Sequence, residues 1–433
     1  MQVEALYQLF QQHPDVSTDT RNIRQGCVFF ALKGASFNGN AFAEQALKLG
    51  AAYAVVDEVE FATDPRCVLV EDVLQALQEL ARLHRKQLDI PIIGVTGTNG
   101  KTTTKELLHA VLSQKFKAFA TRGNLNNHIG VPLSLLAIDD SYEIAIIEMG
   151  ANHVGEIAFL SDIAQPTHGL ITNVGKAHLE GFGSFEGVKT AKGELYDFIK
   201  AHDGQLFVQG NNGHLMEMVR AKNIDEEAII SYGFSNLNTL YGRLIAADPY
   251  LSIAWKQADE PQEYVVKTQL TGSYNLENFL AAITVGLHFG LHADEINRGI
   301  SEYAPKNNRS QITKTARNTV IADFYNANAS SMSAALDNMS ALTAPRKAII
   351  LGDMFELGED SFEEHARVVC KAKGLGPFHL IFVGEEFYKH RDEEAKFYRT
   401  TEEAKDTVAS LEDCFVLLKA SRGMAFEQLL EVL

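Results

Sequence analysis

The amino-acid sequence predicts an α/β protein made of three units. Short apolar runs alternate with amphipathic helical runs along the whole chain, which is typical of mostly parallel sheets covered by helices. A glycine-rich turn joins a predicted strand to a predicted helix near residue 100. The 433 residues correspond to about three domains at roughly 100–200 residues each. We expect these units at residues 1–89, 90–306 and 307–433.

The first unit is expected to be a small α/β fold, with strands at 27–32 and 51–56 and helices at 41–49 and 71–88. The later helix is strongly amphipathic. The apolar positions expected on its buried face are Leu74, Leu77, Leu80, Ala81 and Leu88. Pro91 disfavours helix in the residue before it, so the unit is expected to end near residue 89.

The second unit is expected to be a central, P-loop ATPase-like sheet that is mostly parallel. Its predicted strands are 92–95, 118–121, 142–147 and 169–172, and its predicted helices are 101–113 and 278–289. Ligands of such sheets bind at the carboxyl ends of the strands. The glycine-rich turn, Glu148 and Asn173 all follow strand ends, so we expect the site there.

The third unit repeats the alternation and is expected to be Rossmann-like. Its predicted strands are 320–323, 348–351, 380–383 and 415–418. Its predicted helices are 331–342, 362–373 and 401–411. A second doubly wound sheet therefore follows the first along the chain.

Composition excludes several classes of protein. The chain has 39 Lys and Arg against 56 Asp and Glu, a net charge of −17, so it lacks the basic excess of a nucleic-acid polymer binder. The N-terminus MQVEALYQLF does not resemble a leader, and no run of about 18 apolar residues predicts membrane insertion. Isolated cysteines are expected to be buried free thiols in a reducing cytoplasm. These are Cys27, Cys67, Cys370 and Cys414.

The segment 94–106, GVTGTNGKTTTKE, has the features of a phosphate-binding loop. Glycines let backbone N–H groups surround phosphate oxygens, and the following helix adds its positive end. The usual spacing places the first glycine at position 95, which is Val95, so a longer variant is present. Lys101 is expected to reach the β- and γ-phosphates, and Thr102 to ligate Mg²⁺. The expected ATP contacts are Gly97, Thr98, Asn99, Gly100, Lys101, Thr102 and Thr103.

This variant loop resembles that of the Mur ligase family, whose members, including the folylpolyglutamate synthases, use ATP to join a carboxylate to an amine. STDTR at 17–21 and FFALKG at 29–34 are similar to the uridine-diphosphate-binding domain of several members. GNLNNHIGVP at 123–132, YNAN at 325–328 and LGDMFELG at 351–358 resemble the branch that adds D-alanyl-D-alanine. The DNPR motif of the diaminopimelate-adding branch is absent.

The resemblance implies an activity and its substrates. D-alanyl-D-alanine would be joined to UDP-N-acetylmuramoyl-tripeptide through an acyl-phosphate, in cytoplasmic peptidoglycan precursor synthesis. It implies a uridine-nucleotide-binding first unit, an ATP-binding second unit and a Rossmann-like third unit. We expect a monomer, although the sequence leaves the oligomeric state open. The third residue of the tripeptide, meso-diaminopimelate or lysine, is left open by the sequence.

The resemblance also implies two Mg²⁺ ions. Thr102 and Glu148 would bind one; Glu148, His178 and a carbamylated Lys192 would bind the other. Lys101, His178 and Lys192 are the implied catalytic residues. Without the resemblance, Glu148 reads as a strand-end carboxylate in solvent, His178 as a solvated loop residue and Lys192 as a surface charge. Lys189 is a neighbouring alternative to Lys192.

Further site residues follow from the same resemblance. Nucleotide contacts would come from Asn275, Asn278, Arg309, Asp323 and Asn326. Substrate contacts would come from Ser17, Thr18, Asp19, Arg21, Lys33, Asn126, Asn127, Lys419, Ser421 and Arg422. Ordinary alternatives remain for several of them: helix capping for Asn275 and Asn278, turn formation for Asn126 and Asn127, and a local ion pair for Asp19 and Arg21.

Five residues depart from the family pattern, and these departures affect the expected shapes of the nucleotide and dipeptide pockets. They are Asn38, Asn40, Tyr274, Ala329 and Ala420.

Two rival functions remain. One is another Mur ligase or a folylpolyglutamate synthase, although the latter lacks a uridine-binding domain. The other is a P-loop switch ATPase without ligation, which would not need the lysine, histidine and glutamate set.

Overall fold

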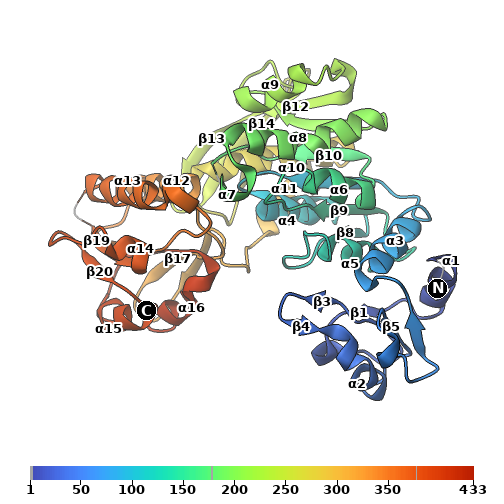
Figure 1. The fold of residues 1–433 in the computed structure, drawn as a ribbon. Coiled ribbons are helices and arrows are strands. Elements are labelled where there is room, and N and C mark those ends of the chain that lie inside the picture. Colours follow the sequence, from blue (N-terminus) through green and yellow to red (C-terminus); the bar gives the residue numbers. More distant parts are fainter. Residues whose placement is uncertain (1–2, 177–178, 377) are drawn as a thin grey trace.

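The computed structural model describes residues 3–176, 179–376 and 378–433. Its described residues form three main sheets in chain order, in agreement with the predicted three-unit α/β fold (Figure 1). In the view of Figure 1 the blue first unit and the orange-to-red third unit flank the central unit on different sides.

The first sheet is parallel and has the order β1-β2-β5-β6. Its unit comprises α1 (Val3–Gln12), β1 (Val16–Ser17), β2 (Val28–Phe30), β3 (Lys33–Gly34), β4 (Phe37–Asn38), α2 (Ala43–Lys48), β5 (Tyr53–Val56), β6 (Cys67–Leu69) and α3 (Val73–Arg85). Helix α3 is shorter than predicted, because Asp72 caps it by accepting a hydrogen bond from Gln75 N. Leu77, Leu80 and Ala81 are buried as expected.

The central sheet has the order β15-β14-β13-β12-β11-β10-β7-β9-β8. Its strands are β7 (Ile92–Thr96), β8 (Ala118–Ala120), β9 (Ile144–Glu148), β10 (His168–Ile171), β11 (Gln205–Gln209), β12 (Ile229–Gly233), β13 (Leu240–Ala247), β14 (Leu251–Gln257) and β15 (Tyr264–Lys267). The predicted parallel arrangement holds from β8 to β13. The β13–β14 and β14–β15 pairs are antiparallel, so the sheet is mixed and ends in an edge that the sequence analysis did not predict.

Helices cover both faces of the central sheet. They are α4 (Lys101–Leu112), α5 (Gly130–Leu136), α6 (Glu156–Ala164), α7 (Leu179–Phe182), α8 (Phe185–Ala201), α9 (Gly213–Ala221), α10 (Leu276–His288) and α11 (Ala293–Glu302). α4, α10 and α11 pack together, whereas α3 of the first unit packs on α5 and α6. The apolar core is therefore continuous between the first two units.

The third sheet has the order β16-β17-β21-β18-β19-β20, with only the β16–β17 pair antiparallel among its described strands. Its strands are β16 (Gln311–Lys314), β17 (Thr319–Asp323), β18 (Lys347–Gly352), β19 (His379–Val383), β20 (Lys396–Tyr398) and β21 (Phe415–Lys419). Its helices are α12 (Ala329–Ala341), α13 (Ser361–Gly374), α14 (Glu385–Tyr388), α15 (Thr401–Ala409) and α16 (Glu427–Leu430).

The four cysteines are free thiols, as expected. Cys27 and Cys414 are buried and Cys67 is half-buried, but Cys370 is exposed on α13. The prediction of buried thiols is therefore wrong for Cys370, because the sequence pattern of α13 does not place that position on its core face. Within the described ranges, no helix is long and apolar enough to cross a membrane.

Two sets of strand ends position the site. Val95 of β7 lies beside Glu148 of β9, and Thr96 lies beside Ile171 of β10. In the third sheet, Asp323 at the end of β17 lies beside Lys419 at the end of β21. Polar groups thus gather at the carboxyl ends of both sheets, where parallel α/β proteins bind ligands.

Candidate active site

The phosphate loop follows β7 and has a fixed backbone. Gly97 and Gly100 have φ values of +140° and +80°, and a Cβ on Gly97 would lie 2.1 Å from Thr172 Oγ1, so glycine is required there. Thr98 N donates to Asn173 O at 2.9 Å. Asn99 N donates to Asn173 Oδ1 at 3.0 Å. The end of β10 therefore sets the shape of the loop.

Lys101 begins α4 and bends back over the loop. Its Nζ donates to Gly97 O at 2.6 Å and to Thr98 O at 3.0 Å. Burial lowers the pKa of Lys101 to about 8; nearby Glu148 opposes this shift and Arg309 adds to it. The ammonium group thus lies beside a carboxylate and a guanidinium at the helix N-terminus, which is a suitable place for polyphosphate.

Glu148 is buried at the end of β9, with 2% of its surface exposed, so the solvent-facing alternative is wrong. Its Oε1 accepts hydrogen bonds from Thr102 Oγ1 at 3.2 Å and Asn126 Nδ2 at 2.8 Å. Its Oε2 is buried and has no hydrogen-bond partner among the described residues. An unpaired buried carboxylate oxygen beside a threonine hydroxyl fits a hard cation such as Mg²⁺.

The two neighbouring lysines of α8 have opposite environments. Lys189 Nζ contacts Glu217 at 2.9 Å and Glu186 at 3.3 Å, and its pKa is raised, chiefly by Glu217. Lys192 has no carboxylate partner of this kind among the described residues, and its Nζ donates to Ala151 O at 3.3 Å. Burial, with a smaller contribution from Lys101, lowers the pKa of Lys192 to about 7. Of the two lysines, Lys192 is therefore the one that more readily loses its proton to give a neutral amine.

The predicted His178 lies outside the described residues, so its expected metal contact is not described. The rest of the predicted metal set comes from three elements, since Thr102 lies on α4, Glu148 on β9 and Lys192 on α8. In the described part of the chain, no group of three His, Cys, Asp or Glu side chains converges as a metal site. A metal at this place therefore depends on Thr102, Lys192 or His178 as well as Glu148.

The predicted asparagines make internal hydrogen bonds. Asn275 Nδ2 donates to Thr271 O at 2.7 Å, and Asn278 Nδ2 donates to Asn275 Oδ1 at 2.9 Å. Asn278 Oδ1 accepts from Thr104 Oγ1 at 3.1 Å. This chain of bonds joins α10 to the first turns of α4 and lies beside Gly100. Both asparagines also line the cavity described below.

The asparagines after β8 have different contacts. Asn126 reaches Glu148, as described above, whereas Asn127 Oδ1 accepts from Ile129 N at 3.1 Å and Gly130 N at 2.9 Å. Asn127 therefore has the turn role that the sequence left open. Both residues also line the cavity, so the turn role does not exclude a ligand contact.

The third unit places cationic groups opposite the phosphate loop. Lys419 Nζ forms an ion pair with Asp323 Oδ2 at 2.7 Å. The guanidinium groups of Arg309 and Arg422 lie 4.0 Å and 5.2 Å from the ring centroid of Tyr325. Arg309 Nε is buried without a hydrogen-bond partner among the described residues. The charge of Lys419 is balanced by Asp323, so Arg309 and Arg422 are the groups that provide positive charge in the cavity that the phosphate loop lines.

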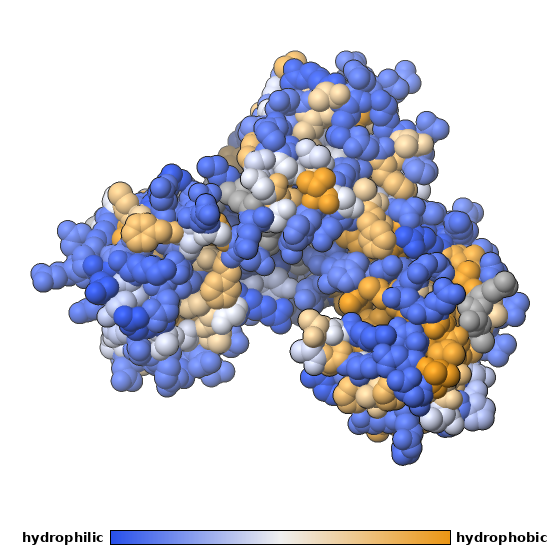
Figure 2. Space-filling model, viewed as in Figure 1, coloured by the Kyte–Doolittle hydropathy of each residue, from blue (hydrophilic) through white to orange (hydrophobic). Residues whose placement is uncertain are grey.

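A cavity of about 800 Å³ connects these elements. In the space-filling view, the surfaces around the junction of the second and third units are mainly hydrophilic (Figure 2). The predicted site residues that line the cavity are Thr98, Asn99, Gly100, Lys101, Thr102, Thr103, Asn126, Asn127, Glu148, Asn275, Asn278, Arg309, Asp323, Asn326, Lys419, Ser421 and Arg422. The structure therefore brings together predictions from two units.

The predicted residues of the first unit lie away from this cavity. Lys33 Nζ contacts Asp57 Oδ1 at 2.9 Å and Glu58 Oε1 at 3.1 Å. The departures Asn38 and Asn40 belong to the same network, since they donate to Glu58 and Asp57, respectively. Their amides therefore hold the two carboxylates that bind Lys33.

The STDTR segment forms a compact local turn. Arg21 binds Asp19 through two guanidinium nitrogens, Nε and Nη2, and Ser17 Oγ donates to Asp19 O at 3.1 Å. Thr18 lies between them at an intermediate level of exposure. The local ion pair that the sequence analysis left open is thus present.

Sequence reasoning missed several residues that line the cavity. Tyr274 OH contacts Ser310 Oγ at 2.8 Å, so this departure from the family pattern joins the second unit to the first residues of the third. Tyr325 and Asn328 belong to the YNAN motif, but no role was predicted for either. Ser330 lies in a stretch without a recognisable motif. Its place is set by tertiary contacts with the phosphate loop.

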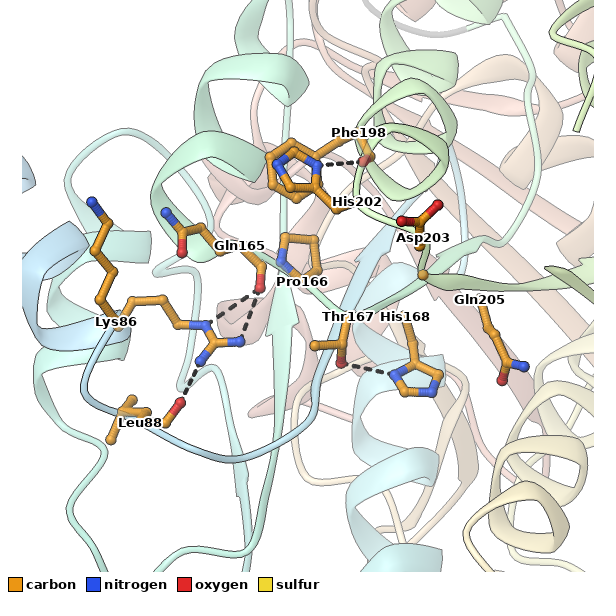
Figure 3. A pocket seen from close by; sticks show the side chains of 12 residues that line it. Lys86, Leu88, Gln165, Pro166, Thr167, His168, Phe198, His202, Asp203 and Gln205 are labelled. Atoms are coloured by element: carbon orange, nitrogen blue, oxygen red, sulfur yellow. Dashed lines mark hydrogen bonds between the residues drawn. The ribbon is translucent and has the colours of Figure 1, made fainter.

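A second cavity, of about 660 Å³, lies at the amino ends of β7, β10 and β11 (Figure 3). The Arg85 and His202 side chains that line it bind backbone carbonyl groups, whereas Lys86 and Asp203, which also line it, are exposed. Arg85 donates to Ala164 O, Gln165 O and Leu88 O, and His202 Nδ1 contacts Phe198 O at 2.8 Å. None of the predicted site residues lines this cavity, so the chemistry is assigned to the other end of the sheet.

Three family models match successive parts of the chain. Residues 15–85 match the Mur ligase family catalytic domain, residues 95–286 the Mur ligase middle domain and residues 308–428 the Mur ligase glutamate ligase domain. The chain is 34% identical to UDP-N-acetylmuramoyl-tripeptide–D-alanyl-D-alanine ligase of Bacillus subtilis (strain 168), covering 96% of this chain and 92% of the relative. The chain belongs to the Mur ligase family.

Other Mur ligases are similar over the whole length. The Escherichia coli (strain K12) protein of the same name is 32% identical over 96% of this chain and 93% of its own. The structure of MurF from Acinetobacter baumannii aligns with a TM-score of 0.85 at 30% identity, covering 98% of this chain and 97% of that one. MurF ligase from Thermotoga maritima in complex with ADP aligns with a TM-score of 0.84 at 26% identity, covering 97% of each chain.

Proposed function

We propose that this chain is an ATP-dependent ligase that joins D-alanyl-D-alanine to UDP-N-acetylmuramoyl-tripeptide, releasing ADP and phosphate. One observation carries the proposal: the phosphate loop, Glu148 and the cationic groups of the third unit line a single cavity, and Glu148 Oε2 has no hydrogen-bond partner among the described residues. The names of the relatives in Bacillus subtilis and Escherichia coli support the choice of substrates.

The reaction requires a better leaving group than oxide. An oxygen of the tripeptide carboxylate attacks the γ-phosphorus, the bond to ADP breaks, and an acyl-phosphate forms. The amine of D-alanyl-D-alanine then attacks the acyl carbon, loses a proton and displaces phosphate. The groups that meet are anionic, so Lys101, Arg309 and the N-terminus of α4 stabilise the charge that develops.

Magnesium fits the donors that are present. Glu148 and Thr102 would hold one ion, and Glu148, His178 and a carbamate on Lys192 would hold a second. When bound, the ions neutralise phosphate charge. Carbamylation joins the neutral Lys192 amine to CO₂ with loss of a proton, and the low pKa of Lys192 supports it.

The remaining site assignments divide between the three proposed domains, 1–89, 90–306 and 307–433. ATP would contact the phosphate loop at residues 97–103, together with Asn275, Asn278, Arg309, Asp323 and Asn326. The uridine-nucleotide end of the substrate would contact Ser17, Thr18, Asp19, Arg21 and Lys33. The peptides would contact Asn126, Asn127, Lys419, Ser421 and Arg422. The enzyme would act in the cytoplasm as a monomer.

Phosphate release tests this function. The protein is incubated with ATP and Mg²⁺, with UDP-N-acetylmuramoyl-tripeptide and D-alanyl-D-alanine added singly or together. We expect rapid release only when both are present. Release that ignores both co-substrates would instead indicate a switch ATPase, and release that requires glutamate and a folate would indicate the folylpolyglutamate branch. Parallel assays with lysine- and diaminopimelate-containing tripeptides identify the third residue.

A further inference from the structure

A ring of three side chains joins the phosphate loop to the third unit. Asn328 Nδ2 donates to Asn99 Oδ1 at 2.8 Å, Asn99 Nδ2 donates to Ser330 Oγ at 2.8 Å, and Ser330 Oγ donates to Asn328 Oδ1 at 2.9 Å. Asn99 lies between the two glycines of the phosphate loop, whereas Asn328 and Ser330 lie at the start of α12. We call this ring the clasp.

The clasp has a single consistent direction of hydrogen bonding. Each side chain donates once and accepts once within the ring. Rotating the Asn99 amide alone by 180° would bring its NH₂ group against the NH₂ group of Asn328, and two donors cannot satisfy each other. Rotating both amides would turn the NH₂ group of Asn328 toward Ser331 N, which donates to Asn328 Oδ1 at 2.9 Å. The clasp therefore requires an amide at position 99, and aspartate, which lacks the donor, cannot replace it.

Both ends of the clasp are firmly anchored. The backbone of Asn99 is held at the end of β10, where Thr172 Oγ1 and Asn173 Nδ2 donate to its carbonyl oxygen at 2.6 Å and 3.1 Å. On the other side, Asn328 caps α12 by accepting from Ser331 N at 2.9 Å. A displacement of α12 therefore pulls on the tip of the phosphate loop.

We propose that Asn328 and Ser330 are positioning residues that link docking of the third unit to the conformation of the phosphate loop. With the clasp formed, α12 is held against the loop, and Lys419 and Arg422 of the same unit face the cavity. The clasp thus assembles the two halves of the site together. This inference rests on the proposed function only for its effect on ligation.

The test uses the full chain with Asn328→Ser and Ser330→Ala combined. Serine keeps a helix-capping oxygen but is too short to reach Asn99, so the clasp is lost while the cap is kept. Asn338→Ala is the matched control, because Asn338 Nδ2 donates to Thr271 Oγ1 at 3.1 Å. That bond also joins α12 to the second unit, but neither of its residues lines the cavity.

Two measurements do not depend on ligase activity. Calorimetry measures ATP affinity. Energy transfer between two dyes measures the separation of the second and third units. The dyes are attached to the exposed Cys370 and to a cysteine that replaces the exposed Arg220, and Cys67→Ser removes the half-buried thiol. We expect the double variant to bind ATP on the order of tenfold more weakly, because it loses the two clasp hydrogen bonds that reach Asn99. The docked fraction should also fall, and the control should change ATP affinity less than about twofold.

The proposal is overturned if the double variant keeps wild-type ATP affinity and unit separation, or if Asn338→Ala weakens ATP binding equally. Should the double variant fail to fold, Ser330→Ala alone leaves the cap and all loop backbone bonds in place and should show a smaller change of the same sign. Absence of ligation by the wild type would reject the proposed function, whereas the affinity and distance measurements would still decide on the clasp.

Discussion

The two ends of the central sheet carry cavities of similar size but opposite chemistry. At the carboxyl ends, Glu148 Oε2 and Arg309 Nε are buried without hydrogen-bond partners among the described residues. At the amino ends, Arg85 donates to three carbonyl groups. Cavity size therefore does not distinguish the two ends. The end that can act on a ligand is the one where buried polar atoms have no hydrogen-bond partner among the described residues.

Replacing Lys192 should have the largest effect. Lys192→Ala is expected to lower kcat on the order of 1,000-fold, because a metal ligand contributes several kcal/mol to transition-state stabilisation. Short carboxylic acids should partly restore activity by supplying an oxygen ligand. Steady-state phosphate release, with and without added acetate, measures both effects.

Lys189→Ala is the matched control for Lys192→Ala, since Lys189 lies on the same helix and its charge is neutralised by Glu186 and Glu217. It should retain kcat within about threefold, because partly exposed ion pairs contribute little. Full activity in Lys192→Ala, or equal losses in the two variants, would refute the carbamate.

Replacing Arg85 tests the other end of the sheet. Arg85→Met should lower the free energy of unfolding by about 1–3 kcal/mol, because the carbonyl groups it satisfies lose a buried donor. kcat and KM should stay unchanged in the folded protein, because the amino-end cavity has no part in the reaction. Urea unfolding and steady-state kinetics check the two halves of this prediction. A loss of kcat with unchanged stability would reverse our assignment of the two ends.

A smaller effect is expected from His168, also at the amino ends. Burial, with a contribution from His288, lowers the pKa of His168 to about 4, compared with about 6.5 in the unfolded chain. The unfolded state therefore binds more protons between these values, and stability falls as pH falls from about 6.5 to about 4. The thermal midpoint should fall over this window, and His168→Phe should reduce the slope. An unchanged slope would show that His168 does not contribute.

The sequence predicted those parts of the fold that depend on local pattern. The strand before the phosphate loop, helix α4 and the alternation of the third unit follow from hydrophobic periodicity and glycine placement. The antiparallel edge formed by β13, β14 and β15 was missed, because its exposed positions give no strong local signal. The exposure of Cys370 was missed because the four cysteines were treated alike, although the buried residues Val368, Val369 and Ala372 place position 370 on the other face of α13.

Residues of the candidate site could be predicted where they belong to a sequence motif or follow one. Glu148 and Lys101, which line the carboxyl-end cavity, were predicted because a strand end and a loop marked them. Lys192 was predicted from a resemblance, and its role stays a prediction. Tyr274 and Ser330 gained their contacts from chain segments far away in sequence: Tyr274 meets Ser310, and Ser330 meets Asn99. Such contacts depend on how the units pack, which local sequence does not specify.

Transfer of oxygen from the tripeptide to phosphate tests the central claim most directly. The terminal carboxylate of UDP-N-acetylmuramoyl-tripeptide is labelled with ¹⁸O, and the phosphate released during ligation is analysed by mass spectrometry. If the carboxyl-end cavity catalyses attack of the carboxylate on ATP, each released phosphate carries one ¹⁸O atom from the substrate. Phosphate without the label would mean that water attacks ATP, and it would contradict the ligase mechanism proposed for this site.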